Sequence, residues 1–352
     1  MNPKTNCRYF RGDIPCKFHK SEGVFCGNCD HYDKITHRIL IIKLGAIGDV
    51  IRTTPLLHKF KNEYPHSEIY WLTYSPEVVP DLVDHILKFE IKNILYLQAL
   101  HFDFLINLDK DREACALAEQ IKADLKVGFK LENGRCVPID DRARHKWLTG
   151  ISDDLNRVNT KSYLEEIFEI CGYKFTGEKY ILNLTENYQW DIKEPRPLVG
   201  LNTGCGSRWT TRLWKIENWI DLAKKLKSEG YGVILLGGEE EDERNRHISK
   251  VANVLYLGYF PLNQFLSLVN QCDLVVTAVS MALHIATGLG KKVVLFNNIF
   301  NRNEFELYGL GQIIEPDVEC KGCFRGKCDT DCMSLINPDE VLAACKSLLS
   351  IK

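Results

Sequence analysis

The feature that most restricts the fold is an almost continuous apolar run, Arg38-Ile39-Leu40-Ile41-Ile42-Lys43, which leads directly into a glycine-containing turn. A strand buried on both faces has this composition, and such strands belong to parallel sheets covered by helices. The turn, Leu44-Gly45-Ala46-Ile47-Gly48, is followed by a predicted helix from about Asp49. This order of strand, tight turn and helix predicts the first unit of a doubly wound α/β domain.

The alternation of strands and helices continues along the chain. In the first half we expect strands at 68–73, 93–97, 102–108 and 126–129, with helices near 76–89 and 112–121. A polar stretch with two prolines, Asn187–Pro197, predicts a linker. The pattern then restarts, with strands expected at 198–202, 232–236, 254–257, 274–277 and 292–296, and helices at 216–228, 240–251, 262–270, 282–288 and 338–350. Two such units create a cleft between the carboxyl ends of two sheets, where ligands of these folds bind.

Length, charge and hydropathy agree with this organisation. A chain of 352 residues suits two domains of ~150 residues each. The formal net charge of −2 gives no overall basic field, so the sequence does not predict a nucleic-acid partner. No run approaches the ~18 apolar residues of a membrane span, and Met1–Cys29 lacks the apolar core of a signal peptide. We therefore expect a cytoplasmic protein.

The first turn carries a candidate catalytic residue. Gly45 and Gly48 allow the backbone to approach a ligand, and the helix that follows presents free N–H groups. Asp49 stands next to them, either as a helix cap or as a carboxylate that removes a proton from a substrate.

The turn after the first strand of the second half suits a diphosphate. Thr203 and Gly204 open a stretch of small and hydroxylated residues that leads to Arg212. Backbone N–H groups, hydroxyls and a guanidinium fork together bind phosphate well. The alternative is a solvated loop with surface arginines.

Two further turns of the second half suit the rest of a nucleotide. Acidic residues 239–243 follow Gly237-Gly238, and one of them could accept the hydroxyls of a ribose, although the helix dipole also favours acids there. The stretch 277–284 ends in a small-residue turn and a predicted helix start, which would point N–H groups at an anion. His284 either reaches that anion or lies in the core.

Taken together, these motifs resemble glycosyltransferase family nine, the heptosyltransferase family of bacterial lipopolysaccharide synthesis. The resemblance covers about residues 38–350 and is carried by the order and spacing of residues 41–49, 202–204, 212–214 with Trp219, 236–238 and 280–284. It implies a GT-B fold of two Rossmann-like domains around a central cleft. It also implies an ADP-activated sugar donor, inversion at the anomeric carbon, and no catalytic metal.

The resemblance assigns roles to individual residues. Asp49 falls on the catalytic base, beside the acceptor and phosphate loop of Gly45 and Gly48. The donor-binding positions are Thr203, Gly204, Arg212, Glu241 (with Glu240 as alternative), Ser280, Met281, Ala282 and His284. Val279 and Met281 depart from the family, which has an Asp and a Gly at this turn. The implied reaction moves a heptose-like sugar from ADP to a lipopolysaccharide-core or related glycan acceptor, and the departure makes an inactive nucleotide-sugar binding or scaffold homologue the alternative.

Composition, the predicted linker and the restart of the strand and helix pattern set the domain boundaries. We expect a Cys-rich metal-binding segment over 1–35, a Rossmann-like acceptor domain over 36–190 and a nucleotide-sugar domain over 191–352. The acceptor is a glycan or a lipid-linked sugar, which leaves peripheral attachment to the inner membrane open.

Eight of the 14 cysteines form two groups that suggest metal binding. Cysteines clustered in a reducing compartment more often bind metal than form disulfides. The first group is Cys7, Cys16, Cys26 and Cys29, and the second is Cys320, Cys323, Cys328 and Cys332. Four thiolates favour a structural zinc in each, with iron or an iron–sulfur cluster as alternatives. A redox or metal-sensing protein and a GT-B epimerase are the remaining readings.

Overall fold

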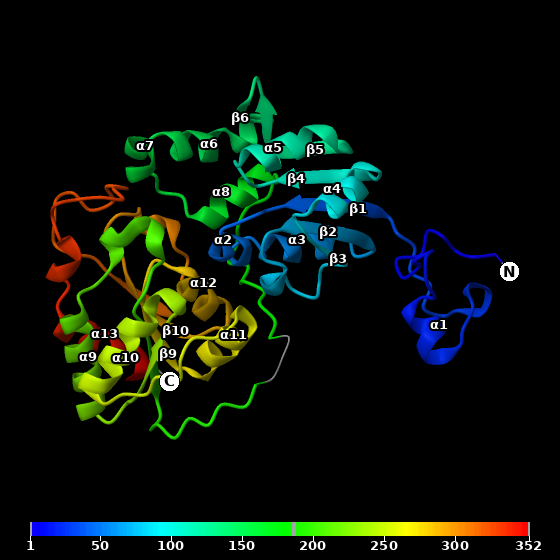
Figure 1. Ribbon diagram of the computed structural model, residues 1–352. Helices are drawn as coiled ribbons and strands as arrows, with labels where there is room; N and C mark the ends of the chain where they lie inside the picture. Colours follow the sequence, from blue (N-terminus) through cyan, green and yellow to red (C-terminus); the bar gives the residue numbers. More distant parts are fainter. Residues whose placement is uncertain (1, 185–187, 351–352) are drawn as a thin grey trace.

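The computed structural model describes residues 2–184 and 188–350 and contains two α/β halves preceded by a small N-terminal segment (Figure 1). The N-terminal segment carries α1 (Lys17–Glu22) and the short 3-10 turn η1 (Cys26–Asn28) and lies to one side of the first half. None of residues 2–36 is buried. This segment therefore has no hydrophobic core of its own.

The first half is a six-stranded sheet in the order β3-β2-β1-β4-β5-β6. Its strands are β1 (His37–Ile42), β2 (Ser67–Thr73), β3 (His85–Lys88), β4 (His101–Asn107), β5 (Lys122–Glu132) and β6 (Arg135–Pro138). All neighbours pair in parallel except β5 and β6, which form an antiparallel hairpin. The predicted buried strand is confirmed, because Ile39 to Ile42 are fully buried and alternate between the two faces of the sheet.

Helices cover both faces of this sheet. Short α2 (Ile47–Ile51), α3 (Leu56–Glu63) and α8 (Tyr163–Ile170) pack on one face, while α4 (Ile91–Gln98) and α5 (Arg112–Gln120) pack on the other. Two more helices, α6 (Arg144–Ile151) and α7 (Asp153–Arg157), lead towards the second half.

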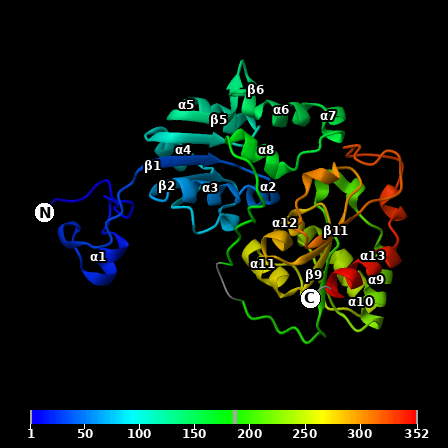
Figure 2. The ribbon, with the colours of Figure 1, turned by 180° about the vertical axis from the view of Figure 1, so that it is seen from behind.

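The second half is a five-stranded parallel sheet in the order β11-β10-β9-β7-β8. Its strands are β7 (Leu198–Asn202), β8 (Gly232–Leu236), β9 (Leu274–Ala278), β10 (Lys292–Phe296) and β11 (Gly311–Ile314). One face is covered by α11 (Leu262–Gln271) and α12 (Met281–Gly288), the other by α9 (Ile216–Ser228), α10 (Asp242–Ala252) and α13 (Pro338–Ser350). Figure 2 shows the same two layered halves from behind.

The structure corrects three predicted elements. Residues 93–97 are helical in α4, because a short apolar run fits either structure and here packs as a helix on the sheet. The predicted helix at 76–89 is instead a 3-10 turn, η2 (Pro76–Val78), followed by β3, which pairs with β2. The strand at 254–257 is reduced to one bridge between Leu255 and Ile234. The predicted linker begins at residue 187, outside the described residues, and 188–197 contain neither helix nor strand.

The two halves meet where α2 of the first contacts α12 of the second. One hydrophobic core runs through this contact and includes Val50 and Ile51 from α2 with Leu283, Ile285 and Ala286 from α12. Both helices follow strand ends, so the contact places the carboxyl edges of the two sheets opposite each other. Among the described residues, no helix is both long and apolar enough to cross a membrane.

Candidate active site

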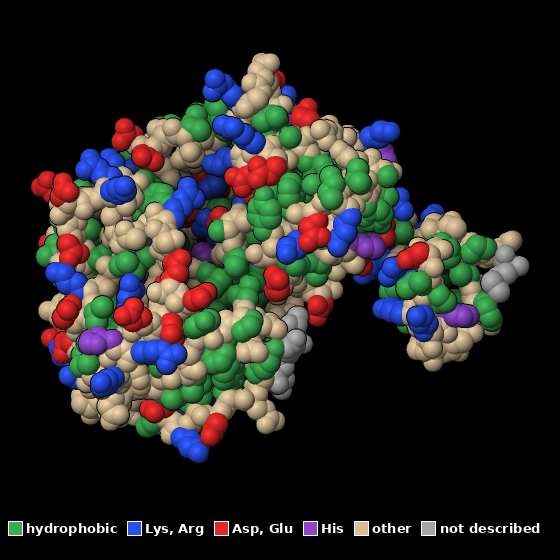
Figure 3. All heavy atoms as spheres, in the orientation of Figure 1, with side chains coloured by type: hydrophobic (Ala, Val, Ile, Leu, Met, Phe, Trp, Pro, Cys, Tyr) green, Lys and Arg blue, Asp and Glu red, His purple; other side chains and the backbone are tan. Residues whose placement is uncertain are grey.

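Two cavities, each of about 460 Å³, open on either side of α2. The first, here called the Asp49 cavity, is walled mainly by the first half and also reached by Arg208 of the second. The other, called the Gly204 cavity, lies at the edge of the second sheet, with Ile47 of α2 at its wall. Figure 3 shows Lys and Arg side chains inside the hollow between the halves. The basic residues that line the Asp49 cavity are Lys43, Arg52, Lys110, Lys146 and Arg208.

Asp49 lies in the first turn of α2 but is not its cap. The helix begins at Ile47, and the N-cap is Ala46, which makes no side-chain capping bond. The capping interpretation of Asp49 is therefore wrong, and its carboxylate is free to face the cavity. Oδ1 accepts a hydrogen bond from Arg52 Nε at 2.8 Å, and Oδ2 lies 4.0 Å from Lys43 Nζ.

The charge of Asp49 is set by these two cations. Burial acts to raise its pKa, but Arg52 and Lys43 outweigh burial and lower the pKa to about 2. Asp49 is therefore an ionised carboxylate throughout the physiological pH range.

Asp109, which the sequence reading missed, fixes the turn that carries Asp49. Its buried carboxylate contacts Lys43 Nζ at 3.3 Å and accepts hydrogen bonds from the backbone N–H groups of Leu44 (2.8 Å) and Gly45 (3.4 Å). Asp109 follows β4, the neighbour of β1, so the two strand ends lie side by side. The sequence signal that could have identified Asp109 is its place directly after a predicted strand.

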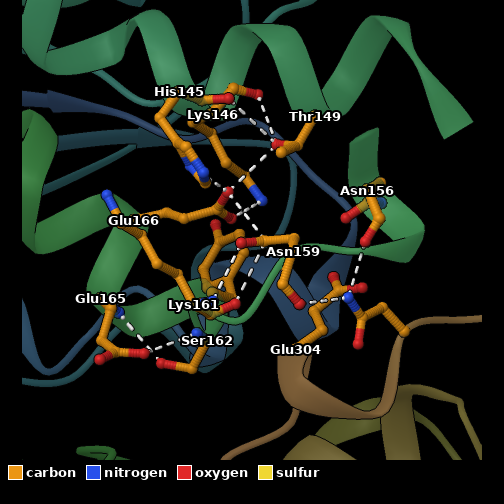
Figure 4. Close-up of polar contacts among 12 residues, drawn as sticks. His145, Lys146, Thr149, Asn156, Asn159, Lys161, Ser162, Glu165, Glu166 and Glu304 are labelled. Atoms are coloured by element: carbon orange, nitrogen blue, oxygen red, sulfur yellow. Dashed lines mark hydrogen bonds and ion pairs between the residues drawn. The ribbon is translucent and has the colours of Figure 1, made fainter. Parts of the chain in front are cut away.

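A second missed group surrounds buried Glu166 on α8 (Figure 4). Its carboxylate accepts hydrogen bonds from Lys146 Nζ (2.6 Å), His145 Nδ1 (3.1 Å), Thr149 Oγ1 (3.1 Å) and Asn159 Nδ2 (3.3 Å). Four donors satisfy the buried charge and hold Lys146 at the wall of the Asp49 cavity.

The Gly204 cavity brings together most of the predicted donor-binding residues. Gly204, Glu241, Ser280, Met281 and Ala282 all line it. Glu241 Oε2 accepts a hydrogen bond from the backbone N–H of Gly238 at 2.9 Å, and its carboxylate lies so close to Gly204 that a Cβ there would be 1.9 Å from Oε1.

The polar floor of this cavity is built on Asn202. Its Nδ2 donates to the backbone oxygen of Gly204 (2.8 Å), to Thr277 Oγ1 (3.0 Å) and to Ser280 Oγ (3.4 Å), so it ties two turns together. Three apolar side chains, Phe260, Leu262 and Phe265, form another wall. The cavity thus offers polar groups at one side and an apolar wall at another.

Three of the predicted donor-binding residues, and Gly48 of the predicted acceptor loop, line neither cavity. Thr203 is buried and its hydroxyl donates to Asn245 Oδ1 at 2.6 Å. Arg212 is also buried and donates to the backbone oxygens of Cys205 (2.8 Å), Trp209 (3.2 Å) and Val279. Arg212 therefore braces the turns of the Gly204 cavity from behind.

The third, His284, is buried between α12 and α2. Burial, aided by the charge of Arg52, lowers its pKa to about 3. His284 is therefore neutral at physiological pH and belongs to the contact between the halves, which supports the core reading of this residue.

The cysteine groups do not form a finished metal site. Within residues 2–184 and 188–350, no three His, Cys, Asp or Glu side chains converge closely enough to hold an ion. All eight thiols are free. Cys7, Cys16, Cys26 and Cys29 do line one common cavity of about 240 Å³ in the N-terminal segment, whereas Cys320 and Cys328 are exposed on the 320–332 loop.

In sequence, the chain is similar to known heptosyltransferases. A model of glycosyltransferase family 9 (heptosyltransferase) matches residues 94–333. The lipopolysaccharide core heptosyltransferase OpsX of Haemophilus influenzae is 23% identical over 285 residues, which cover 73% of this chain and 77% of OpsX.

Solved structures show the fold. A family 9 glycosyl transferase from Veillonella parvula superposes with a TM-score of 0.69 at 18% identity, covering 90% of this chain and 98% of that one. The E. coli ADP-heptose lipopolysaccharide heptosyltransferase II gives a TM-score of 0.66 at 18% identity, with 89% and 98% covered. The iron-containing glycosyltransferase TibC of E. coli gives a TM-score of 0.51 at 16% identity, with 90% and 77% covered. The predicted GT-B-like α/β fold with parallel sheets is confirmed.

Proposed function

The chain belongs to glycosyltransferase family 9, and from that premise we propose that it is an inverting transferase that moves a heptose-like sugar from an ADP-linked donor to a lipopolysaccharide-core or related glycan acceptor. One observation carries the proposal: an ionised carboxylate, Asp49, stands in a cation-lined cavity next to a second cavity suited to a nucleotide. The acceptor domain comprises residues 36–190 and the nucleotide-sugar domain residues 191–352. The protein works in the cytoplasm, at the inner membrane surface when its acceptor is lipid-linked.

The donor nucleotide occupies the Gly204 cavity. Glu241 accepts hydrogen bonds from the ribose, the apolar wall of Phe260 and Phe265 contacts the base, and the start of α12 at Met281 faces the diphosphate. Gly204 leaves room for the backbone to approach the phosphates. Similarity to the E. coli ADP-heptose lipopolysaccharide heptosyltransferase II supports adenine as the base of the donor.

The acceptor occupies the Asp49 cavity. Its hydroxyl oxygen attacks the anomeric carbon from the face opposite the diphosphate, and the bond from that carbon to the phosphate oxygen breaks. The hydroxyl proton passes to Asp49, and ADP leaves with the electron pair. A positioned base of this kind contributes about 10²–10⁴-fold in rate, and fixed N–H donors stabilise the charge on the leaving group without reorganising.

A binding protein that has lost transfer is the alternative, motivated by Val279 and Met281 at the donor turn. Incubation with ADP-heptose and a heptose-free lipopolysaccharide core tests the choice. The transferase releases ADP and adds one heptose to the mass of the acceptor. A chain that binds ADP but releases none from the donor would be the binding homologue.

We also propose a structural metal, zinc before iron or an iron–sulfur cluster, at each cysteine group, and no catalytic metal. The shared cavity of the four N-terminal cysteines and the lack of a core in residues 2–36 support the first site. TibC, a glycosyltransferase with a similar fold, contains iron, which supports the proposal of a bound metal in this chain. Metal analysis of the purified chain is expected to find about two ions per chain, and fewer than one would refute both sites.

A further inference from the structure

Arg52 joins two carboxylates that come from opposite halves of the molecule. It lies one turn after Asp49 on the same segment, and its guanidinium is buried over the ring of Tyr163, 3.6 Å from the ring centroid. Nε donates to Asp49 Oδ1 at 2.8 Å. Nη2 lies 2.8 Å from the same oxygen and 2.8 Å from Glu304 Oε1.

Glu304 belongs to the second half and reaches Arg52 through a docked loop. It ends the 3-10 turn η6 (Arg302–Glu304), which follows β10. The side chain of Asn301 donates to the backbone oxygens of Asn156 (2.6 Å) and Asn159 (2.7 Å) in the first half. Asn303 donates to the same Asn159 oxygen at 3.1 Å. Figure 4 shows Glu304 on the segment that faces Asn156 and Asn159.

The position of the docked loop therefore determines whether Arg52 pairs with one carboxylate or with two. With Glu304 in place, one buried guanidinium is divided between two charges. Without it, Arg52 would be left with Asp49 alone and would be free to turn entirely towards it. A carboxylate held by a whole guanidinium is a poorer proton acceptor and adopts a different orientation.

We infer that Glu304 is a positioning residue, which acts through Arg52 to keep Asp49 oriented and reactive when the two halves are docked. The inference rests on the proposed role of Asp49 as base. Glu304 touches neither proposed substrate, since it lines neither the Asp49 cavity nor the Gly204 cavity. It links the arrangement of the halves to the chemistry of the first half.

Glu304→Gln tests the inference in the full chain with ADP-heptose as donor and heptose-free core as acceptor. We expect kcat to fall about 10-fold, while the donor KM and ADP affinity change less than about 2-fold. Glu304→Asp should recover part of the loss. Arg302→Gln is the matched control, because it breaks the neighbouring pair of Arg302 with Glu315 (3.1 Å) without touching Arg52.

A double-variant cycle separates positioning from a general structural role. If Glu304 acts through Arg52, adding Glu304→Gln to Arg52→Gln should cause no further loss of kcat. A full 10-fold loss in that background, or unchanged kcat in Glu304→Gln alone, would overturn the inference. Asp49→Ala distinguishes the two proposals. If Asp49→Ala is inactive while Glu304→Gln is fully active, only the positioning role of Glu304 is contradicted. A parent chain without transfer removes both.

Discussion

The imidazole of His284 lies directly against Gly48, so closely that a Cβ built on Gly48 would stand 2.4 Å from His284 Cδ2. Gly48 immediately precedes Asp49 on α2, and His284 is on α12. The glycine that the sequence suggested for a ligand thus serves the contact between the two halves. It sets the distance between the proposed base and the helix that faces the proposed diphosphate.

Replacing Gly48 with Ala should therefore disturb both stability and transfer. The new methyl group overlaps a buried ring, and such overpacking costs about 1–3 kcal/mol. Thermal unfolding and ADP release measure the two effects. Gly326→Ala is the control, because nothing lies within 4 Å of a Cβ there. A Gly48→Ala chain that matches the control in both measurements would contradict the close contact.

His284 should make the protein less stable as the solution becomes acidic. Burial lowers its pKa to about 3, against an ordinary value of 6.5. Between these values the unfolded chain takes up a proton that the folded chain excludes, so stability falls as the pH drops from 6.5 towards 3.

His284→Asn removes that proton uptake. The loss of unfolding free energy between pH 7.5 and pH 5, measured with urea, should shrink by about 2 kcal/mol at most. His247→Asn, at an exposed position on α10, should retain the loss seen in the parent. Equal pH dependence in His284→Asn and the parent would show that His284 is not held neutral.

Arg212 should affect nucleotide binding without contacting the nucleotide. Its guanidinium bonds three backbone oxygens that hold the turns of the Gly204 cavity. Arg212→Met leaves them without a donor, and we expect ADP affinity to fall about 10- to 100-fold. Arg212→Lys should not restore binding, because a single ammonium does not reproduce the planar fork.

Titration calorimetry with ADP checks this prediction. Lys224→Met is the control, since Lys224 is an exposed cation on α9. Unchanged ADP affinity in Arg212→Met would mean that the turns keep their shape without the brace.

The sequence predicted the elements whose pattern is strong and local. Residues 39–42, 198–202 and 274–277 are buried in their sheets, and their mainly apolar runs marked them as strands. β3 and β11 escaped notice because each is a four-residue strand at the edge of its sheet, formed by pairing with one neighbour. Such strands depend on contacts distant in sequence and leave little periodicity.

Site residues that belong to a local sequence motif could be predicted. Contacts between residues far apart in the sequence could not. Asp49 and Glu241 were found from the turns that carry them, and both line the cavities. Arg52 with Glu304, or Lys43 with Asp109, are pairs made only by the tertiary fold. The spacing of these residues along the chain does not predict the pairs, because they form only when particular strand ends and loops become neighbours in the fold.

The proposed sugar transfer depends most on Asp49, and one pair of measurements tests that role directly. Heptose transfer and ADP binding are measured side by side for the parent and for Asp49→Ala. We predict that transfer falls about 10²–10⁴-fold while ADP affinity stays within about 2-fold, because Asp49 lies outside the Gly204 cavity. Equal transfer rates in the two proteins would contradict the assignment of Asp49 as the base.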